Sequence, residues 1–106
     1  MYSDFNKNVG KRINENRKLL RLSREKFSEM IDISPQFLAE IETGKKGMST
    51  VTLLKICRGL GVSSDYILTG NPDCSEKVVL DMLSELDEHQ LSKAKELLRV
   101  FVSAVK

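Results

Sequence analysis

A tight turn followed at once by a helix start, in the run Asp32-Ile33-Ser34-Pro35, constrains this chain more than any other feature of its sequence. Asp is among the few residues that tolerate a left-handed backbone, so Asp32 predicts the end of a short helix. Ser34 can cap the next helix through its side-chain oxygen, and Pro35 fits the first helical position, where a missing N–H costs nothing. The run therefore predicts two short helices joined by a turn of about three residues.

Capping residues also bound this pair of helices at its outer ends. Ser23 predicts the start of the first helix, and Gly44 predicts the end of the second. The inward residues of the first helix are expected to be Phe27, Met30 and Ile31. In the second helix, Leu38 and Ile41 define the inward side at about 100° per residue. We therefore expect an outward surface with few charges, formed by Gln36, Ala39, Glu40 and Thr43.

Three further helices are predicted around this pair, so that residues 1–70 hold five. The N-terminal helix has a stripe that we expect to be buried: Phe5, Val9, Ile13, Asn16 and Leu20. A fourth helix starts at Ser49 or Thr50, ends at Gly61 and is expected to direct inward Leu53, Leu54, Ile56, Cys57 and Leu60. Ser63 caps the fifth helix, which is expected to close the core with Tyr66, Ile67 and Leu68.

The last third of the chain is predicted to be a linker followed by two helices. Residues 71–75 (NPDCS) have linker composition, and Asp87 with Gln90 has the pattern of a capping box within residues 76–106. Two helices cannot bury both of their apolar faces alone, so we expect this oligomerisation segment to form a homodimer. The alternative is that it binds another protein, as in an antitoxin-like or peptide-responsive regulator. The residues expected at the dimer contact are Leu91, Ala94, Leu98, Phe101, Val102 and Val105.

Composition narrows the classes of protein further. With 106 residues, 41% of them hydrophobic, the chain fits one compact domain or a small domain with an appendage. It has no apolar run near the roughly eighteen residues that cross a bilayer, no secretory signal and no CxxC pair, which together predict a cytoplasmic protein without a membrane partner. Residues 1–70 hold 12 Lys and Arg against 8 Asp and Glu, whereas residues 71–106 hold 5 against 7. This asymmetry favours the N-terminal part as the partner of a polyanion.

Several residues fit the pattern of a known family. They are Phe27 and the small Ser28, Asp32 and Ile33 at the turn, Leu38, and the runs 41–45 (IETGK) and 61–68 (GVSSDYIL). Over residues 7–69 the chain resembles the Cro/CI-type repressors, also called the XRE family. Ser28 stands where Ala is usual and Asp32 where Gly is usual, and both are compatible with the turn. Pro35 replaces a residue that often touches bases in the family.

The resemblance implies an all-α protein, with a five-helix lambda-repressor-like DNA-binding domain followed by a C-terminal helical pair for dimerisation. It also implies a function: a sequence-specific regulator of transcription that binds double-stranded DNA as a homodimeric repressor. Residues 34–43 would enter the major groove, at half-sites about one helical turn, roughly 34 Å, apart.

The expected DNA contacts fall into two groups. Base edges would be read by Gln36, Phe37, Glu40 and Thr43, of which Gln36 can pair bidentately with adenine. Burial is the alternative for Phe37, and an exposed ion pair is the alternative for Glu40. Phosphates would be bound by Ser23, Arg24, Ser34, Lys45 and Lys46. The resemblance further implies an ion pair of Arg17 with Glu42 that ties the first helix to the end of the recognition helix.

No group of residues indicates catalysis, a metal or a cofactor. His89 is the only histidine and lies among acidic residues at the start of the last helix, so we expect a surface position. No glycine-rich phosphate loop is present, and no small-molecule ligand is evident. Cys57 is expected in the core, whereas a redox role for Cys74 in the linker stays open. We therefore predict that the chain is not an enzyme.

Overall fold

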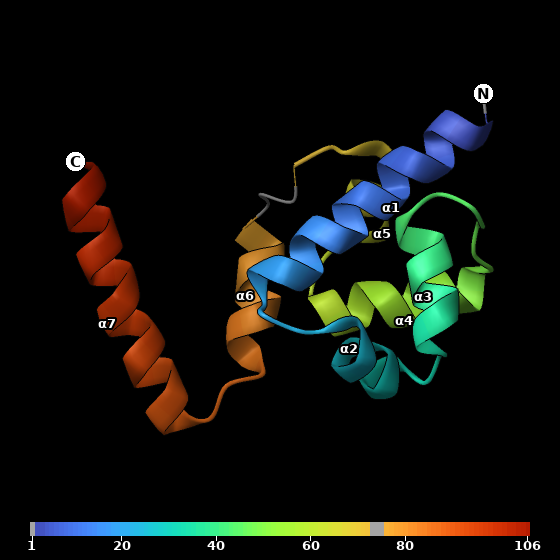
Figure 1. Cartoon of the computed structure of the whole chain (residues 1–106). Helices are drawn as coiled ribbons and strands as arrows, with labels where there is room; N and C mark the ends of the chain where they lie inside the picture. Colours follow the sequence, from blue (N-terminus) through green and yellow to red (C-terminus); the bar gives the residue numbers. More distant parts are fainter. Residues whose placement is uncertain (1, 73–75) are drawn as a thin grey trace. The chain divides into compact units, whose positions relative to one another are not determined.

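The computed structural model describes residues 2–72 and 76–106, and these residues form seven α-helices and no strand (Figure 1). They divide into an N-terminal unit, Met1–Asp73, and a C-terminal unit, Cys74–Lys106. The N-terminal unit holds α1 (Tyr2–Leu19), α2 (Arg24–Ile31), α3 (Pro35–Glu42), α4 (Thr50–Leu60) and α5 (Ser64–Thr69). The C-terminal unit holds α6 (Glu76–Ser84) and α7 (Glu88–Val105). The all-α class expected from the sequence is confirmed.

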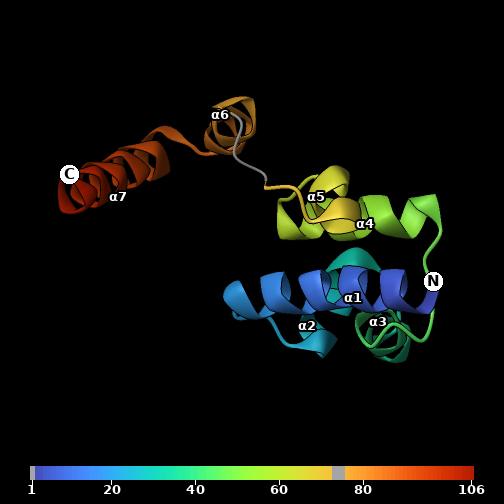
Figure 2. The ribbon, with the colours of Figure 1, turned by 90° about the horizontal axis from the view of Figure 1, so that it is seen from above.

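The core of the N-terminal unit lies between α1 and the four shorter helices. Helix α1 contacts α3, α4 and α5, and α2 contacts α3 and α4. Figure 2 shows α1 running lengthwise with α3 on one side and α5 on the other. All five helices contribute buried apolar side chains to one cluster: Val9, Ile13, Phe27, Ile31, Leu38, Ile41, Ile56, Cys57, Leu60 and Ile67. The expected core position of Cys57 is thus confirmed.

Serine side chains start four of the helices as the sequence predicts. Ser23, Ser34, Ser49 and Ser63 each accept a hydrogen bond from the backbone N–H three residues later. Such a cap stabilises a helix by about 1 kcal/mol, because it satisfies a donor that the helix itself leaves unpaired. Pro35 occupies the first position of α3, as expected.

Left-handed residues end these helices. Asp32 (φ 59°) follows α2, and the next N–H, that of Ile33, bonds back to the carbonyl oxygen of Ser28 at 3.0 Å. Gly44 (φ 82°) acts in the same way after α3, so the predicted turn and helix end are confirmed. The sequence did not reveal a third case, Arg21 (φ 59°), which follows α1. A left-handed backbone costs a non-glycine residue about 1–2 kcal/mol, so this position carries strain.

Four residues that were predicted to be inward are exposed instead: Phe5, Leu20, Met30 and Leu54. On α1, the neighbouring helices cover Val9 and Ile13 and leave both ends of the predicted stripe open. On α2, Phe27 and Ile31 are buried one turn apart, whereas Met30 is 53% exposed. The period of the apolar residues was correct, but on α1 the core covers only the middle of the stripe, and Met30 and Leu54 lie at the edge of the buried side of their helices.

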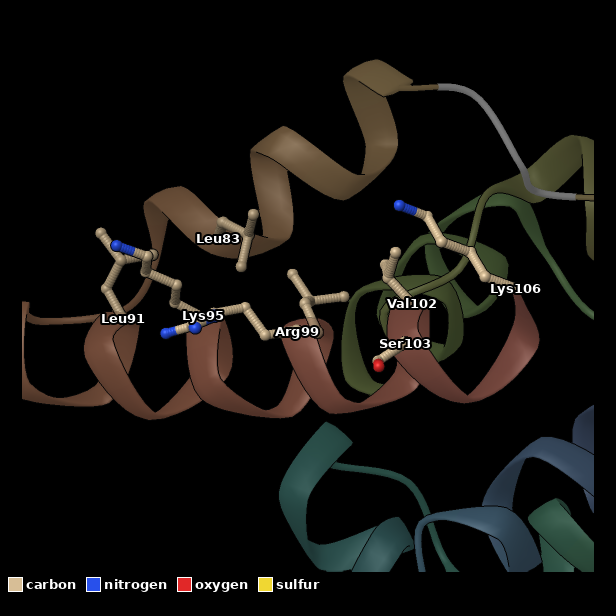
Figure 3. A pocket seen from close by; sticks show the side chains of 8 residues that line it. Leu83, Leu91, Lys95, Arg99, Val102, Ser103 and Lys106 are labelled. Atoms are coloured by element: carbon tan, nitrogen blue, oxygen red, sulfur yellow. The ribbon is translucent and has the colours of Figure 1, made fainter.

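The C-terminal unit has no buried residue in either of its helices. Helix α7 begins with the predicted capping box, in which Asp87 accepts from the backbone N–H of Gln90 at 2.8 Å and Gln90 accepts from that of Asp87 at 3.1 Å. A groove between α6 and α7 is lined by apolar and cationic side chains (Figure 3): Leu83, Leu91, Lys95, Leu98, Arg99, Val102, Ser103 and Lys106. Residues 73–75 of the predicted linker, with Cys74, lie outside the described residues.

Candidate nucleic-acid interface

Helix α3 presents a mainly uncharged outer surface. Gln36 is exposed, and its side chain has no hydrogen-bond partner among the described residues. Phe37 is half-buried against the core, so the structure places it between the two alternatives that the sequence left open. Ala39 is also partly covered, whereas Thr43 is exposed at the end of the helix. The surface available to a ligand therefore extends from Gln36 to Thr43 along one side of α3.

The single carboxylate on this surface, that of Glu40, is paired. Lys46 Nζ lies 3.2 Å from Glu40 Oε2, and the Glu40 side chain is only 25% exposed. Lys45 is exposed and has no ion-pair partner among the described residues. The Thr43 hydroxyl donates to the carbonyl oxygen of Ala39 at 2.9 Å, which fixes its rotamer and leaves oxygen lone pairs outward. Of the two lysines that follow α3, Lys45 is therefore the one whose positive charge is unpaired within the described residues.

Two cap hydroxyl groups flank this surface: Ser34 lies at the start of α3, and Ser23 directly precedes Arg24, which contacts Glu42 at the end of α3. Ser23 and Ser34, the N-caps of α2 and α3, both use the oxygen as an acceptor from the helix backbone. Neither hydroxyl donates a hydrogen bond to any described residue, so both retain a donor for a bound group. The positive ends of two helix dipoles lie at the same caps and favour an anionic group.

Behind the surface, three side chains donate hydrogen bonds to the carboxylate of Glu42. Arg17 donates through Nε to Oε2 at 2.8 Å and through Nη2 to Oε1 at 3.1 Å. Asn14 Nδ2 and Arg24 Nε both donate to Oε1, at 2.7 and 2.9 Å. The Glu42 side chain is 1% exposed, so we refer to Asn14, Arg17, Arg24 and Glu42 as the Glu42 cluster.

The Glu42 cluster fixes the charge of its carboxylate. Burial by itself raises the pKa of Glu42, but the hydrogen bonds from Arg17, Asn14 and Arg24 outweigh burial and hold the pKa below its ordinary value of 4.5. Arg17 also donates through Nη1 to the carbonyl oxygen of Leu22 at 2.7 Å. The cluster therefore ties α1, the start of α2 and the end of α3 together.

Close backbone packing supports the same junction. Gly10 on α1 lies against the end of α3, where an added Cβ would be 2.8 Å from the carbonyl carbon of Glu42 and closer still to the carbonyl oxygens of Ile41 and Glu42. No real Cβ tolerates such contacts. Gly10 therefore allows α1 to approach α3 closely enough for Arg17 to reach Glu42.

Sequence reasoning missed two members of the Glu42 cluster. Asn14 was given no role, and Arg24 was assigned to phosphate without any contact to Glu42. Neither contact has a local signal, because Asn14 and Arg24 are 28 and 18 residues from Glu42 along the chain. The one signal that could have pointed to the junction is Gly10, a glycine inside a helical pattern.

The part of the chain that the structure describes contains no group of three or more His, Cys, Asp and Glu side chains that could hold a metal ion. His89 lies exposed in the first turn of α7, where the sequence placed it. None of the helices in the described ranges combines the length and apolar content needed to traverse a lipid bilayer.

Comparison with known proteins identifies the family. The signature of the helix-turn-helix domain matches residues 10–72, more than half of the chain. The chain belongs to the helix-turn-helix domain family. The resemblance to the XRE family is thereby confirmed. Within the helix-turn-helix domain, α2 and α3 are the two helices joined by the predicted turn.

Individual relatives are regulators. The chain is 43% identical over 42 residues to the control protein C.MunI of a Mycoplasma species, and this match spans 40% of the chain and 57% of that protein. The restriction-modification controller protein C.AhdI from Aeromonas hydrophila shares the fold, with a TM-score of 0.56 and 22% identity over 58% of this chain and 94% of that one.

A second solved structure, the clp gene regulator ClgR from Corynebacterium glutamicum, matches with a TM-score of 0.57 and 26% identity over 60% of this chain and 83% of that one. The helix-turn-helix family and these regulators support a DNA-binding regulator of transcription.

Proposed function

We propose that this helix-turn-helix protein is a sequence-specific repressor that binds double-stranded DNA as a homodimer and inserts α3 in the major groove. The observation that carries the proposal is the surface of α3. An unpaired amide, Gln36, stands at its start beside the N-cap hydroxyl of Ser34, and a free cation, Lys45, follows its end. The regulator functions of the relatives support the same reading.

Base recognition falls to the outer side of α3. Side chains in the major groove discriminate between base pairs by hydrogen bonds to base edges, and Gln pairs bidentately with adenine N6 and N7. Gln36 meets this requirement because it is exposed and unpaired. Thr43 contributes a second contact from the end of the helix, and half-buried Phe37 can touch a thymine methyl group. Glu40 can accept from a cytosine amine only while its pairing with Lys46 leaves an oxygen free.

Phosphate binding falls to groups on both sides of this surface. Ser23 and Ser34 offer hydroxyl donors at helix N-termini, and Arg24, Lys45 and Lys46 offer positive charge. Contacts to phosphate supply most of the affinity and fix the register of the protein on the duplex. Since Lys46 is shared with Glu40, Lys45 is the better test of a phosphate contact.

The C-terminal helices would supply the second subunit. Helix α7 exposes the apolar residues predicted at the dimer contact, apart from the partly covered Ala94, together with Leu97 and Val100. Positions 91, 94, 98, 101 and 105 follow one another at three- and four-residue steps and so lie on one side of the helix. An exposed apolar face of this length is stabilised by a partner, and a second copy satisfies the two-fold symmetry of a palindromic operator.

Gel-shift titrations with a duplex selected from a random pool, and with a random duplex, test the DNA proposal. Gln36→Ala is expected to reduce the preference for one base pair by about 1–3 kcal/mol and to leave random duplex binding unchanged. Lys45→Ala is expected to weaken both duplexes alike and to lower the salt slope by about one. Arg58→Ala removes an exposed cation of α4 and serves as the control. Equal behaviour of the first two variants would remove Gln36 from the reading surface.

The C-terminal unit also favours a second candidate function, in which α7 binds a different protein. The observation behind it is the same exposed apolar face. Leu98→Asp distinguishes the two, because it should give monomers and weaken operator binding if α7 forms the dimer. Analytical ultracentrifugation would report intact dimers if the face serves another partner instead. Ser92→Asp, on the polar side of α7, is the matched control.

A further inference from the structure

Arg24 uses only one edge of its guanidinium group within the protein. Its Nε donates to Glu42 Oε1 at 2.9 Å, and no Nη hydrogen bond to a described residue accompanies this contact. The Arg24 side chain is 42% exposed, whereas that of its partner Glu42 is 1% exposed. A guanidinium held on the Nε side keeps its Nη donors for another acceptor.

The charges of the Glu42 cluster do not cancel. Arg17 alone balances the carboxylate of Glu42, since it binds both carboxylate oxygens and its side chain is 8% exposed. Arg24 adds a second positive charge to the same carboxylate. The cluster therefore has one excess positive charge, and the exposed side chain of Arg24 is the member that can present it to solvent.

Arg24 also stands in the right place for an anion. It is the first residue of α2, directly after the N-cap Ser23 with its unused hydroxyl donor, and Glu42 is the last residue of α3. The contact thus joins the positive end of α2 to the helix that carries Gln36.

We propose that Glu42 is a positioning residue for DNA binding: it holds Arg24 by Nε so that the Nη donors of Arg24 bind one backbone phosphate in register with α3. This inference rests on the proposed function and adds to it. Glu42 was expected to have a structural role only, and here the same carboxylate also links base reading to phosphate binding.

The physical gain comes from preorganisation. A free arginine loses about 2 kcal/mol of side-chain entropy when it is fixed, and a side chain held before binding has lost much of it already. Lysine keeps the charge but has no Nε donor, so it cannot be held by Glu42 and bind a phosphate in the same geometry. The two cations are interchangeable at a site that needs charge alone, and they differ at a site that needs orientation.

The test compares full-length Arg24→Lys, Arg24→Ala and wild type on the selected duplex over a range of salt concentrations. Arg24→Ala is expected to weaken binding about tenfold or more and to lower the salt slope by about 0.9, the value for one phosphate. On a logarithmic scale of affinity, Arg24→Lys should recover less than half of the loss that Arg24→Ala causes. Arg58→Lys, the same exchange at an exposed cation of α4 outside the proposed interface, should stay within about twofold of wild type.

Phosphate ethylation interference locates the contact. One ethylated phosphate that blocks wild-type binding should have no effect on Arg24→Ala. A thermal unfolding scan of each variant checks that the Arg17–Glu42 contact still supports the fold.

The inference is overturned by any of three results: Arg24→Lys recovers more than half of the lost affinity, Arg24→Ala binds within twofold of wild type, or its salt slope is unchanged. Failure of the proposed function looks different, because wild type itself would then show no preference for any duplex.

Discussion

Removal of the Glu42 charge should destabilise the protein far more than removal of a charge at its surface. All four hydrogen bonds to the Glu42 carboxylate are donated by neighbours, from Asn14, Arg17 and Arg24. Glu42→Gln keeps the shape but replaces one acceptor oxygen with an NH2 donor. Whichever way the amide is turned, its nitrogen then faces at least one N–H of Arg17.

The magnitude follows from burial and from the number of bonds. The better orientation of the amide loses one charge-assisted hydrogen bond, worth about 1.5–3 kcal/mol, and leaves the buried Arg17 without a counter-charge. Removal of one partner from a buried ion pair costs about 3–5 kcal/mol. Because Arg24 is partly exposed, we expect about 3 kcal/mol, which corresponds to a fall of roughly 12–24 °C in Tm for a domain of this size.

Urea denaturation followed by far-UV circular dichroism measures this difference, with all variants at one protein concentration. Glu40→Gln is the control, since its partner Lys46 is 57% exposed and the pair should contribute less than about 1 kcal/mol. If Glu42→Gln loses no more stability than Glu40→Gln, the Glu42 cluster does not hold the helices together and the reasoning is refuted.

Two further predictions concern the same junction. The folded pKa of Glu42 lies below its ordinary value of 4.5, so the stability that this carboxylate contributes is fully present above about that pH and is lost as the pH falls through the folded pKa. The urea midpoints of wild type and Glu42→Gln should therefore converge in acid. A difference between the two midpoints that stays constant to low pH would contradict this prediction. Gly10→Ala should destabilise the protein by more than about 1–3 kcal/mol, because the new methyl group meets backbone atoms rather than a movable side chain. Gly47→Ala is the control, measured by the same urea curves. A Cβ at Gly47 has no contact closer than 3.7 Å, so this substitution should have little effect.

Local chemistry made much of the fold predictable. Ser23, Ser34 and Asp32 determine helix ends through contacts within a few residues, so the printed sequence contains nearly all the information needed to place them. The left-handed Arg21 escaped prediction because its side chain has no preference for that backbone.

Contacts between distant residues were less accessible. The periodicity of Phe5 and Met30 predicted a buried face, but whether a neighbouring helix covers a given turn depends on the packing of the whole unit. For the same reason the Arg24–Glu42 contact could not be read from the chain, although the outward position of Gln36 followed from helical geometry alone.

The absence of a buried residue in α6 and α7 affects how the activity of the regulator depends on protein concentration. Under the proposed dimer, these helices gain a core only when two chains meet, so the concentration of competent dimer would rise with the square of chain concentration while monomers predominate. Promoter occupancy would then change over a narrow interval of protein level, and dilution at cell division could reset it without any effector.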